Sequence, residues 1–183
     1  MGLTILFWTV GIQLASAASM WVSGSDIYLD GQIKHEDSSR LNIIIQNNPQ
    51  TNRVVIIQSP GGNLYAGIRM GQSIRSYGLE TYLQKDCSSA CNHIFAGGFF
   101  RDMAPTAKLG LHIGGQTFDH NYYTTYQLFE IQRSAAATMI DRVYHYLKMG
   151  VSIEVLDIMA TKNIYEVRWM YRSEAQRTNF VNK

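Results

Sequence analysis

The sequence has almost no net charge, and this excludes one class of partner at the outset. Its 183 residues include 16 Lys and Arg against 14 Asp and Glu, a formal net charge of +2. A protein that binds nucleic acid needs a basic surface, and a solvating tail needs a run of like charges. We therefore expect no nucleic-acid partner.

Cysteine and proline are also scarce. Two cysteines are too few for a disulfide-rich miniprotein or a four-cysteine zinc site. Three prolines and 15 glycines exclude collagen-like and disordered chains. With 46% hydrophobic residues, the chain is long enough for one domain with a buried core and too short for two.

The first 17 residues contain no charged side chain. An apolar run, Leu3 to Leu14, leads to Ala15-Ser16-Ala17, which has the small residues that signal peptidase accepts before its cut. A membrane anchor or a buried first helix is the alternative, but about 15 apolar residues are short for a span of ~20. We expect a signal peptide at 1–17 and one domain at 18–183. The protein would then be exported, periplasmic or secreted, and would meet the membrane only transiently.

Strand and helix patterns alternate along the rest of the chain. This alternation predicts an α/β fold with parallel strand pairing. Gly67 and Gly71, four residues apart on a helix, would let another backbone approach closely. Strands are expected at 25–31, 53–58, 79–83, 107–113 and 167–170, and helices at 36–47, 64–77, 88–96, 122–149, 153–161 and around Glu174-Ala175.

Three short segments have the residue types of a hydrolytic site. In Ser59-Pro60-Gly61-Gly62, two glycines between a strand and a helix would let backbone N–H groups point at an anion; a plain turn is the alternative. In Cys87-Ser88-Ser89-Ala90-Cys91, a serine at a helix start is either a nucleophile or an ordinary N-cap. His112, at a strand end before Ile113-Gly114-Gly115, is either a general base or a structural histidine.

The order of these segments resembles the ClpP protease family of the crotonase-like superfamily, most closely its exported branch. The resemblance covers about residues 25–180. Its matching pieces are Ser59-Pro60-Gly61-Gly62, Gly67, Ser89, Ala96-Gly97, Arg101, His112, Arg168-Trp169-Met170 and Ser173-Glu174-Ala175.

The resemblance implies a single-domain α/β fold of the ClpP/crotonase type, a spiral of ββα units. It implies a serine peptidase in which Ser89 is the nucleophile and His112 the general base. Backbone N–H groups of Gly61 or Gly62 and of Ala90 would form the oxyanion hole. It implies a peptide or protein substrate, no cofactor, no metal, and homo-oligomeric rings.

The third member of a Ser-His-Asp triad has no match. The family's Asp falls near Val167, and the neighbouring Glu166 would point to the opposite face of a strand. Asp157 and Asn163 are further candidates, and the sequence does not choose between them. This gap also fits a catalytically inert, ClpP-like peptide-binding module. A crotonase-type acyl-CoA enzyme is a third alternative, but no basic pocket for its phosphates is visible.

Cys87 and Cys91 are four residues apart, which on one helical turn puts their Cα atoms ~6 Å apart, within disulfide range. In an exported protein we expect a disulfide that braces the turn around Ser89. The alternatives are a metal site that adds His93 and His112 or His120, and a thiol nucleophile.

Two groups of apolar and aromatic residues are assigned structural roles. Tyr122, Tyr123 and Tyr126 are expected to pack a helix start on the core, with a substrate groove as the alternative. Met139, Val143 and Leu147 recur at helical spacing and predict a core or subunit face.

Overall fold

The structure is a computed structural model that describes residues 17–113, 122–161 and 166–183. Within these ranges, strands and helices alternate as the sequence predicts. Their bounds are β1 (Ser19–Ser23), β2 (Asp26–Asp30), α1 (Asp37–Asn47), β3 (Arg53–Gln58), α2 (Leu64–Ser76), β4 (Glu80–Leu83), β5 (Asp86–Ser88), α3 (Ala90–Ala96), β6 (Arg101–Met103), β7 (Lys108–Leu111), α4 (Thr125–Lys148), α5 (Glu154–Ala160), β8 (Arg168–Tyr171) and α6 (Arg172–Arg177).

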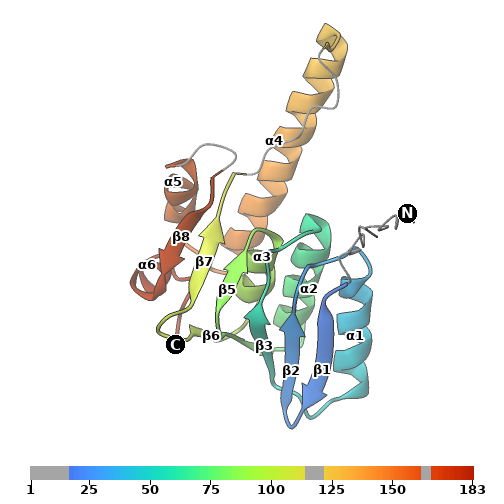
Figure 1. The fold of residues 1–183 in the computed structure, drawn as a ribbon, viewed down its shortest axis with the longest axis vertical. Helices are drawn as coiled ribbons and strands as arrows, with labels where there is room; N and C mark the ends of the chain where they lie inside the picture. The colour runs from blue at the N-terminus through green and yellow to red at the C-terminus, as the bar shows by residue number, and fades with distance from the viewer. Residues whose placement is uncertain (1–16, 114–121, 162–165) are drawn as a thin grey trace, which may run out of the picture.

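The strands form two mixed sheets in one α/β domain. One sheet has the order β1-β2-β3-β4-β6, and the other has the order β5-β7-β8 (Figure 1). The pairs β2–β3, β3–β4, β4–β6 and β5–β7 are parallel, whereas β1–β2 and β7–β8 are antiparallel. The predicted class and the parallel pairing are therefore confirmed at this level.

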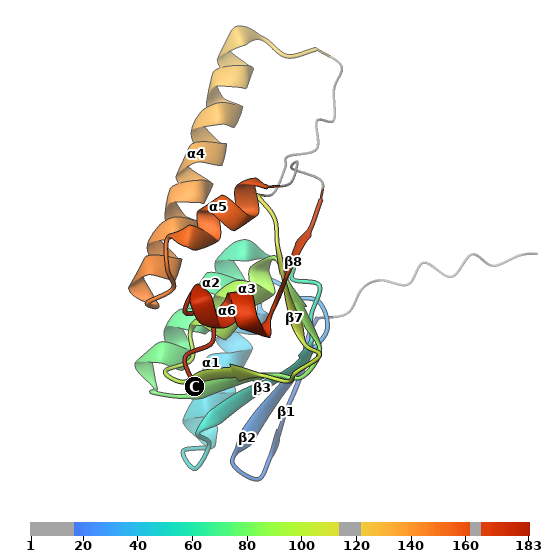
Figure 2. The same cartoon turned by 90° about the vertical axis from the view of Figure 1, so that its left-hand side faces the viewer.

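One part of the core lies between the larger sheet and the helices α1, α2 and α3, which cover one of its faces (Figure 2). The same core continues to the smaller sheet, α5 and α6, as the buried residues Met170, Val155 and Ala175 show. The β-branched run in β3 explains its central place, because Val54, Val55 and Ile56 are all buried. A strand that is covered on both sides selects such continuous apolar runs.

Helices α2 and α3 approach each other backbone to backbone. A Cβ atom built on Gly67 would lie 2.4 Å from the carbonyl oxygen of Ala90, and one on Gly71 would lie 2.2 Å from that of His93. On the facing helix end, a Cβ on Gly97 would lie 2.3 Å from the Gly71 carbonyl oxygen. Real Cβ atoms do not come this close, so the expected backbone approach at Gly67 and Gly71 is confirmed and includes Gly97.

The structure corrects the predicted start of α3. The sequence predicts a helix from residue 88, but Asp86–Ser88 form β5, and α3 begins at Ala90. Strand β5 is only three residues long and pairs with β7, a partner 22 residues away. These residues form a strand because they pair with β7, and the local sequence pattern does not predict a pairing with so distant a segment. Two further short strands, β1 and β6, were also missed.

Helix α4 extends away from the rest of the domain, and only its carboxyl-terminal end lies beside the other elements (Figures 1 and 2). The expectation that its aromatic start packs on the core is wrong, because Tyr122 is 91% and Tyr126 is 72% exposed. Leu147 is also 48% exposed, so it is not a core residue. The buried residues of α4 are Arg142, His145 and Tyr146.

In the described ranges, no helix is both long and apolar enough to cross a membrane. The predicted signal peptide lies outside these ranges except for Ala17.

Candidate active site

Ser89 lies at a sharp turn between β5 and α3. Its backbone has φ 57° and ψ −123°, and it is one of two non-glycine residues with positive φ in the described chain. Such a conformation costs about 1–3 kcal/mol and persists only where the surroundings enforce it. Although Ser89 occupies the N-cap position, its side chain makes no capping hydrogen bond. The alternative that Ser89 is an ordinary cap is therefore wrong.

The turn around Ser89, which we call the elbow (residues 87–91), is fixed on several sides. The Ser89 N–H and the Asn92 side-chain amide both donate to the carbonyl of Gly110 in β7, over 3.1 and 2.7 Å. The predicted disulfide is present, with a Cα–Cα distance of 5.4 Å, and both cysteines are fully buried. Because it joins residues 87 and 91, it brackets Ser89. The alternative metal site and thiol nucleophile would need the same sulfur atoms, which are bonded to each other.

Gly61, the first residue of the glycine pair after β3, lies directly against the elbow. A Cβ on Gly61 would be 2.5 Å from the Ser88 carbonyl oxygen, 2.7 Å from the Ser89 Cβ and 2.8 Å from the Ala90 nitrogen. Gly61 has φ +88°, so this approach requires glycine there. Gly62, at φ +138°, packs against Ile33 instead, because a Cβ on Gly62 would lie 2.2 Å from the Ile33 carbonyl oxygen.

The hydrogen bonds separate the two candidate glycine donors. The Gly61 N–H donates to Ser59 Oγ over 3.1 Å, so it is already engaged. The N–H groups of Gly62 and Ala90 make no hydrogen bond with any described residue. An oxyanion needs unengaged N–H donors beside the serine. Gly62 directly follows Gly61, and the Ala90 nitrogen lies 2.8 Å from the position of a Cβ on Gly61, so both N–H groups are candidate donors.

His112 directly follows β7, the parallel neighbour of β5. Ser88 pairs with Gly110 across these strands, so Ser89 and His112 both emerge at the carboxyl ends of adjacent strands. Ligand sites in open α/β sheets lie at such ends. Between the Ser89 hydroxyl and the His112 ring, which are both in the described chain, the structure contains no hydrogen bond.

The environment of His112 favours its neutral form. Burial lowers the pKa of His112 below its usual value of 6.5, and the positive charge of Arg142 lowers it further. Arg142, from α4, donates to the main-chain carbonyls of His112, over 2.6 Å, and of Ile113. A neutral imidazole is the form that accepts a proton from a serine.

A third member of the triad is absent from the described chain. No Asp or Glu in it forms a hydrogen bond or ion pair with His112. Val167 occupies the sequence position near which the resemblance predicts the Asp. Its Cγ1 would lie 2.9 Å from a Cβ built on Gly110. Glu166 and Asp157 are exposed, and Asn163 and His120 lie outside the described residues.

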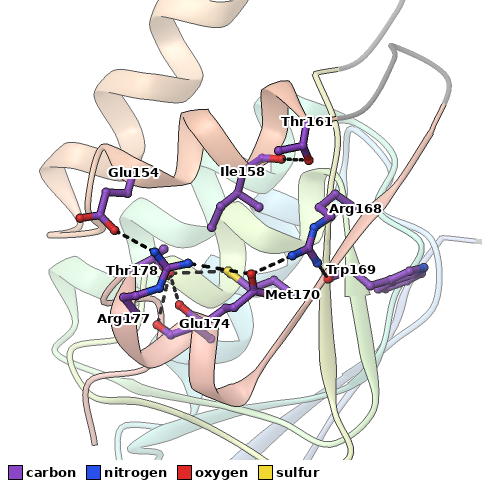
Figure 3. A network of polar contacts seen from close by, with 10 residues as sticks. Glu154, Ile158, Thr161, Arg168, Trp169, Met170, Glu174, Arg177 and Thr178 are labelled. Carbon is purple, nitrogen blue, oxygen red and sulfur yellow. Dashed lines mark hydrogen bonds and ion pairs between the residues drawn. The ribbon is translucent and has the colours of Figure 1, made fainter.

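Glu174 in α6 and Glu154 in α5 bind arginines rather than His112. Glu174 lies 2.7 Å from Arg168 and 3.9 Å from Arg177, and Arg177 also lies 3.5 Å from Glu154 (Figure 3). These ion pairs join α5, β8 and α6, so they stabilise the carboxyl-terminal part of the domain.

A pocket of about 370 Å³ adjoins the elbow through Ser88, but neither Ser89 nor His112 lines it. Its wall combines the carboxyl ends of β2 and β3, strand β5 and an indole ring from β8. It is lined by Gly31, Gln58, Ser59, Pro60, Asp86, Ser88 and Trp169.

Sequence reasoning missed Arg142 and its neighbours. The buried residues Arg142, His145 and Tyr146 of α4 interact with His93 of α3. We call these three residues of α4 the α4 base. His93 stacks on Tyr146 with ring centroids 4.4 Å apart, and a ring nitrogen of His145 lies 3.0 Å from the His93 carbonyl oxygen. The available signal was their i, i+3, i+4 spacing, but polar residues at that spacing usually form an exposed face.

Comparison with protein-family models finds no match, and comparison with curated proteins finds none either.

Proposed function

We propose that this protein is a serine hydrolase that cleaves peptides or unfolded protein segments with Ser89 as nucleophile and His112 as general base. A ClpP/crotonase-type fold and an exported location belong to the same proposal. Its main support is the backbone of Ser89: a strained turn presents a hydroxyl without an intramolecular hydrogen bond next to two unengaged N–H groups. A nucleophile held at a strained strand-to-helix turn is a recurrent solution in hydrolases.

The reaction follows from these positions. Ser89 Oγ attacks the substrate carbonyl, and the His112 ring takes the hydroxyl proton. The N–H groups of Gly62 and Ala90 bind the resulting oxyanion, each contributing ~2.7–4 kcal/mol to the transition state. Collapse of the intermediate breaks the C–N bond, and the leaving amine receives the proton from His112. Water, activated by the same imidazole, then hydrolyses the acyl-enzyme.

The charge near His112 makes this a slow catalyst. In a complete triad, an aspartate stabilises the imidazolium and fixes the tautomer, and its loss costs about 10⁴ in rate. Here, among the described residues, the charge that lowers the pKa of His112 is that of Arg142, which disfavours the imidazolium. We expect turnover on the order of 10⁴-fold below that of a complete triad.

The pocket beside the elbow supports a peptide substrate. Its volume of about 370 Å³ suits one side chain or a short segment, and Trp169 and Pro60 supply apolar walls. Asp86 adds a carboxylate at the wall, 3.5 Å from Lys108 Nζ.

Self-association is a further part of the proposal. Helix α4 exposes large apolar side chains over much of its length, among them Leu128, Phe129, Ile140 and Tyr144. Such a helix would gain stability by packing on a second copy.

A fluorophosphonate probe tests the catalytic proposal. We expect the purified protein to become covalently labelled, because the probe needs an activated serine beside an oxyanion hole. Ser89→Ala should lose all labelling. Ser39→Ala is the control, because Ser39 is an exposed serine of α1 outside the elbow and the pocket, and this change should leave labelling unchanged within a few-fold.

The alternative function is a catalytically inert peptide-binding module, which the missing carboxylate at Val167 favours. Under that alternative no probe labels the protein from pH 5 to 9, but a peptide still binds with a Kd that Ser89→Ala does not change. Labelling that persists in Ser89→Ala would contradict the assignment of the nucleophile.

A further inference from the structure

The first residue of the predicted mature domain lies inside the protein. Ala18 is only 1% exposed, although Ser19, the next residue, is exposed. The Ala18 N–H donates to Asp37 Oδ2 over 3.2 Å, and the Ala18 carbonyl accepts from Arg40 Nη1 over 3.0 Å. Both polar groups of this residue are therefore held by side chains from the first turn of α1.

Asp37 is a fully buried acid whose oxygens have different partners. Oδ1 lies 2.6 Å from Arg40 Nη1, whereas Oδ2 accepts the N–H of Ala18 and, over 2.7 Å, the N–H of Lys34. A buried carboxylate is stable only when it is paired and hydrogen-bonded. The Arg40 side chain is 41% exposed, so its charge is partly screened by solvent.

Asp26 shows how a buried acid of this protein is otherwise satisfied. Its two oxygens receive Nε and Nη2 of Arg53 over 3.0 and 2.7 Å, a complete two-pronged ion pair. In Asp37, by contrast, only Oδ1 accepts from Arg40, and Oδ2 accepts from main-chain N–H groups. In Asp26 the second carboxylate oxygen accepts from an arginine, whereas in Asp37 the corresponding oxygen accepts from the Ala18 N–H.

We propose that the chain is processed between Ala17 and Ala18 and that the new α-ammonium of Ala18 pairs with Asp37. This inference goes beyond the hydrolase proposal and does not depend on it. Hydrolysis of the 17–18 peptide bond adds water, leaves a carboxylate on Ala17 and gives Ala18 a protonated amine. A neutral amide with one N–H then becomes a cation with three, beside a carboxylate oxygen, and such charge-assisted hydrogen bonds are about twice as strong.

The structure also selects between two possible cuts. Ala15-Ser16-Ala17 and Ser16-Ala17-Ala18 both present small residues to signal peptidase. A cut after Ala18 would remove the residue that contacts Asp37 and Arg40 and would leave Asp37 Oδ2 without one of its two hydrogen bonds. The contacts therefore point to Ala18 as the first residue of the mature protein.

Expression of the full-length chain in an exporting bacterium tests the position of the cut. Amino-terminal sequencing and intact mass of the exported protein should both give Ala18 as the first residue. A start at Ser19, or a retained leader, would overturn the proposal.

A thermodynamic cycle tests the pairing itself. Two proteins are prepared, one that starts at Ala18 and one with Gly-Gly added before Ala18. Each is made as a fusion protein, and removal of the fusion partner leaves the chosen amino terminus. We expect the extension to lower the Tm by about 5 °C with Asp37 present, and by less than about 1 °C in Asp37→Asn. Asp26→Asn is the matched control, in which the extension should still lower the Tm by the full amount.

An equal effect of the extension with and without Asp37 would refute the pairing. Since Asp37→Asn risks failing to fold, a second measurement uses the unaltered mature protein. Acetic anhydride should modify the Ala18 amine at least tenfold more slowly in the folded protein than in urea, as followed by peptide mass spectrometry. Equal rates would also refute the pairing.

Discussion

Ser89 and His112 follow neighbouring parallel strands, but different kinds of contact hold them. At the elbow, backbone packs on backbone: Gly61 leaves no room for a Cβ, and the Cys87–Cys91 disulfide closes the turn. His112 is tied to the α4 base through its main-chain carbonyl, which accepts from Arg142. The helix that supplies Arg142 is largely exposed beyond that point (Figure 1).

This difference has a physical consequence. Close-packed backbone has few alternative arrangements, since any shift creates a clash. Arg142 binds main-chain carbonyls and so does not itself fix the His112 ring, which forms no hydrogen bond with any described residue. We therefore expect the nucleophile Ser89 to be rigid and the side chain of the general base His112 to change position. This agrees with the absence of a Ser89–His112 hydrogen bond among the described residues.

The largest expected effect comes from disturbing the elbow with Gly61→Ala. The new Cβ would meet the Ser88 carbonyl oxygen at 2.5 Å and would also place a side chain at φ +88°. Positive φ costs roughly 1–2 kcal/mol and overpacking another 1–3 kcal/mol. We expect fluorophosphonate labelling to fall more than about 100-fold, as measured by labelling rate, and the unfolding free energy to fall by about 3 kcal/mol.

Gly78→Ala is the matched control for backbone strain alone. Gly78 has φ +66°, but a Cβ there meets no atom within 4 Å. It should lose about 1–2 kcal/mol of stability and keep its labelling rate. Equal labelling losses in both variants would show that close packing at the elbow is not what matters.

The histidines His145 and His93 should make the folded protein less stable at acid pH. Burial lowers the pKa of His145 to about 4; the charges of Arg75 and Lys148 lower it as well, while its hydrogen bond to the His93 carbonyl opposes the shift. Burial also lowers the pKa of His93 well below its usual value. Below pH 6.5 the unfolded chain therefore binds protons that the folded chain does not. His145 alone should remove about 3 kcal/mol of stability as the pH falls from 6.5 to 4.

Urea unfolding at several pH values measures this loss. His145→Gln should flatten the curve between pH 6.5 and 4, because the group that titrates differently is gone. His35→Gln is the control, since His35 is exposed. If both variants keep the slope of the unaltered protein, His145 does not determine the acid sensitivity.

The two regions also differ in how far the sequence predicts them. The pieces of the elbow are local in sequence: Cys87 and Cys91 are four residues apart, and the glycine pair closely follows a β-branched strand. The spacing of the two cysteines predicts the disulfide, and the structure confirms it. The predicted helical turn is wrong, because Cys87 lies in β5 and only Cys91 lies in α3. The contact of Gly61 with Ser89 belongs to the tertiary fold, and only the resemblance to a known family suggested it.

The α4 base was not predictable in the same way. Arg142, His145 and Tyr146 are buried because α3 and α4 pack together, with polar residues on the contact face. A hydrophobic pattern places Met139, Val143 and Leu147 inward, and Leu147 proves to be half exposed. Where buried residues are polar, periodicity selects the wrong face of a helix.

Removing the charge from the α4 base should shift the pH dependence of labelling. Burial and the Arg142 charge lower the pKa of His112, so neutral imidazole and full labelling are expected down to a pH below 6.5. In Arg142→Gln that pKa rises, and the acid limb of the labelling rate moves to higher pH. The carbonyls of His112 and Ile113 also lose their donor, so the maximal rate should fall roughly tenfold.

Arg142→Lys separates charge from geometry, because lysine keeps the charge but not the fork that reaches two carbonyls. Its maximal rate should fall while its acid limb stays at low pH. An unmoved limb in Arg142→Gln would mean that Arg142 acts only through packing.

The smallest expected effect is that of the disulfide. It closes a loop of a few residues, so in the chain-entropy view it stabilises the fold by only about 2 kcal/mol. The glycine contacts and the hydrogen bonds to the Gly110 carbonyl remain without it. The double variant Cys87→Ala, Cys91→Ala should therefore label only a few-fold more slowly, with an unchanged acid limb, since His112 and Arg142 are untouched. Labelling as weak as that of Gly61→Ala would instead make the covalent bridge the main restraint on Ser89, and the elbow would depend on oxidation rather than on backbone packing.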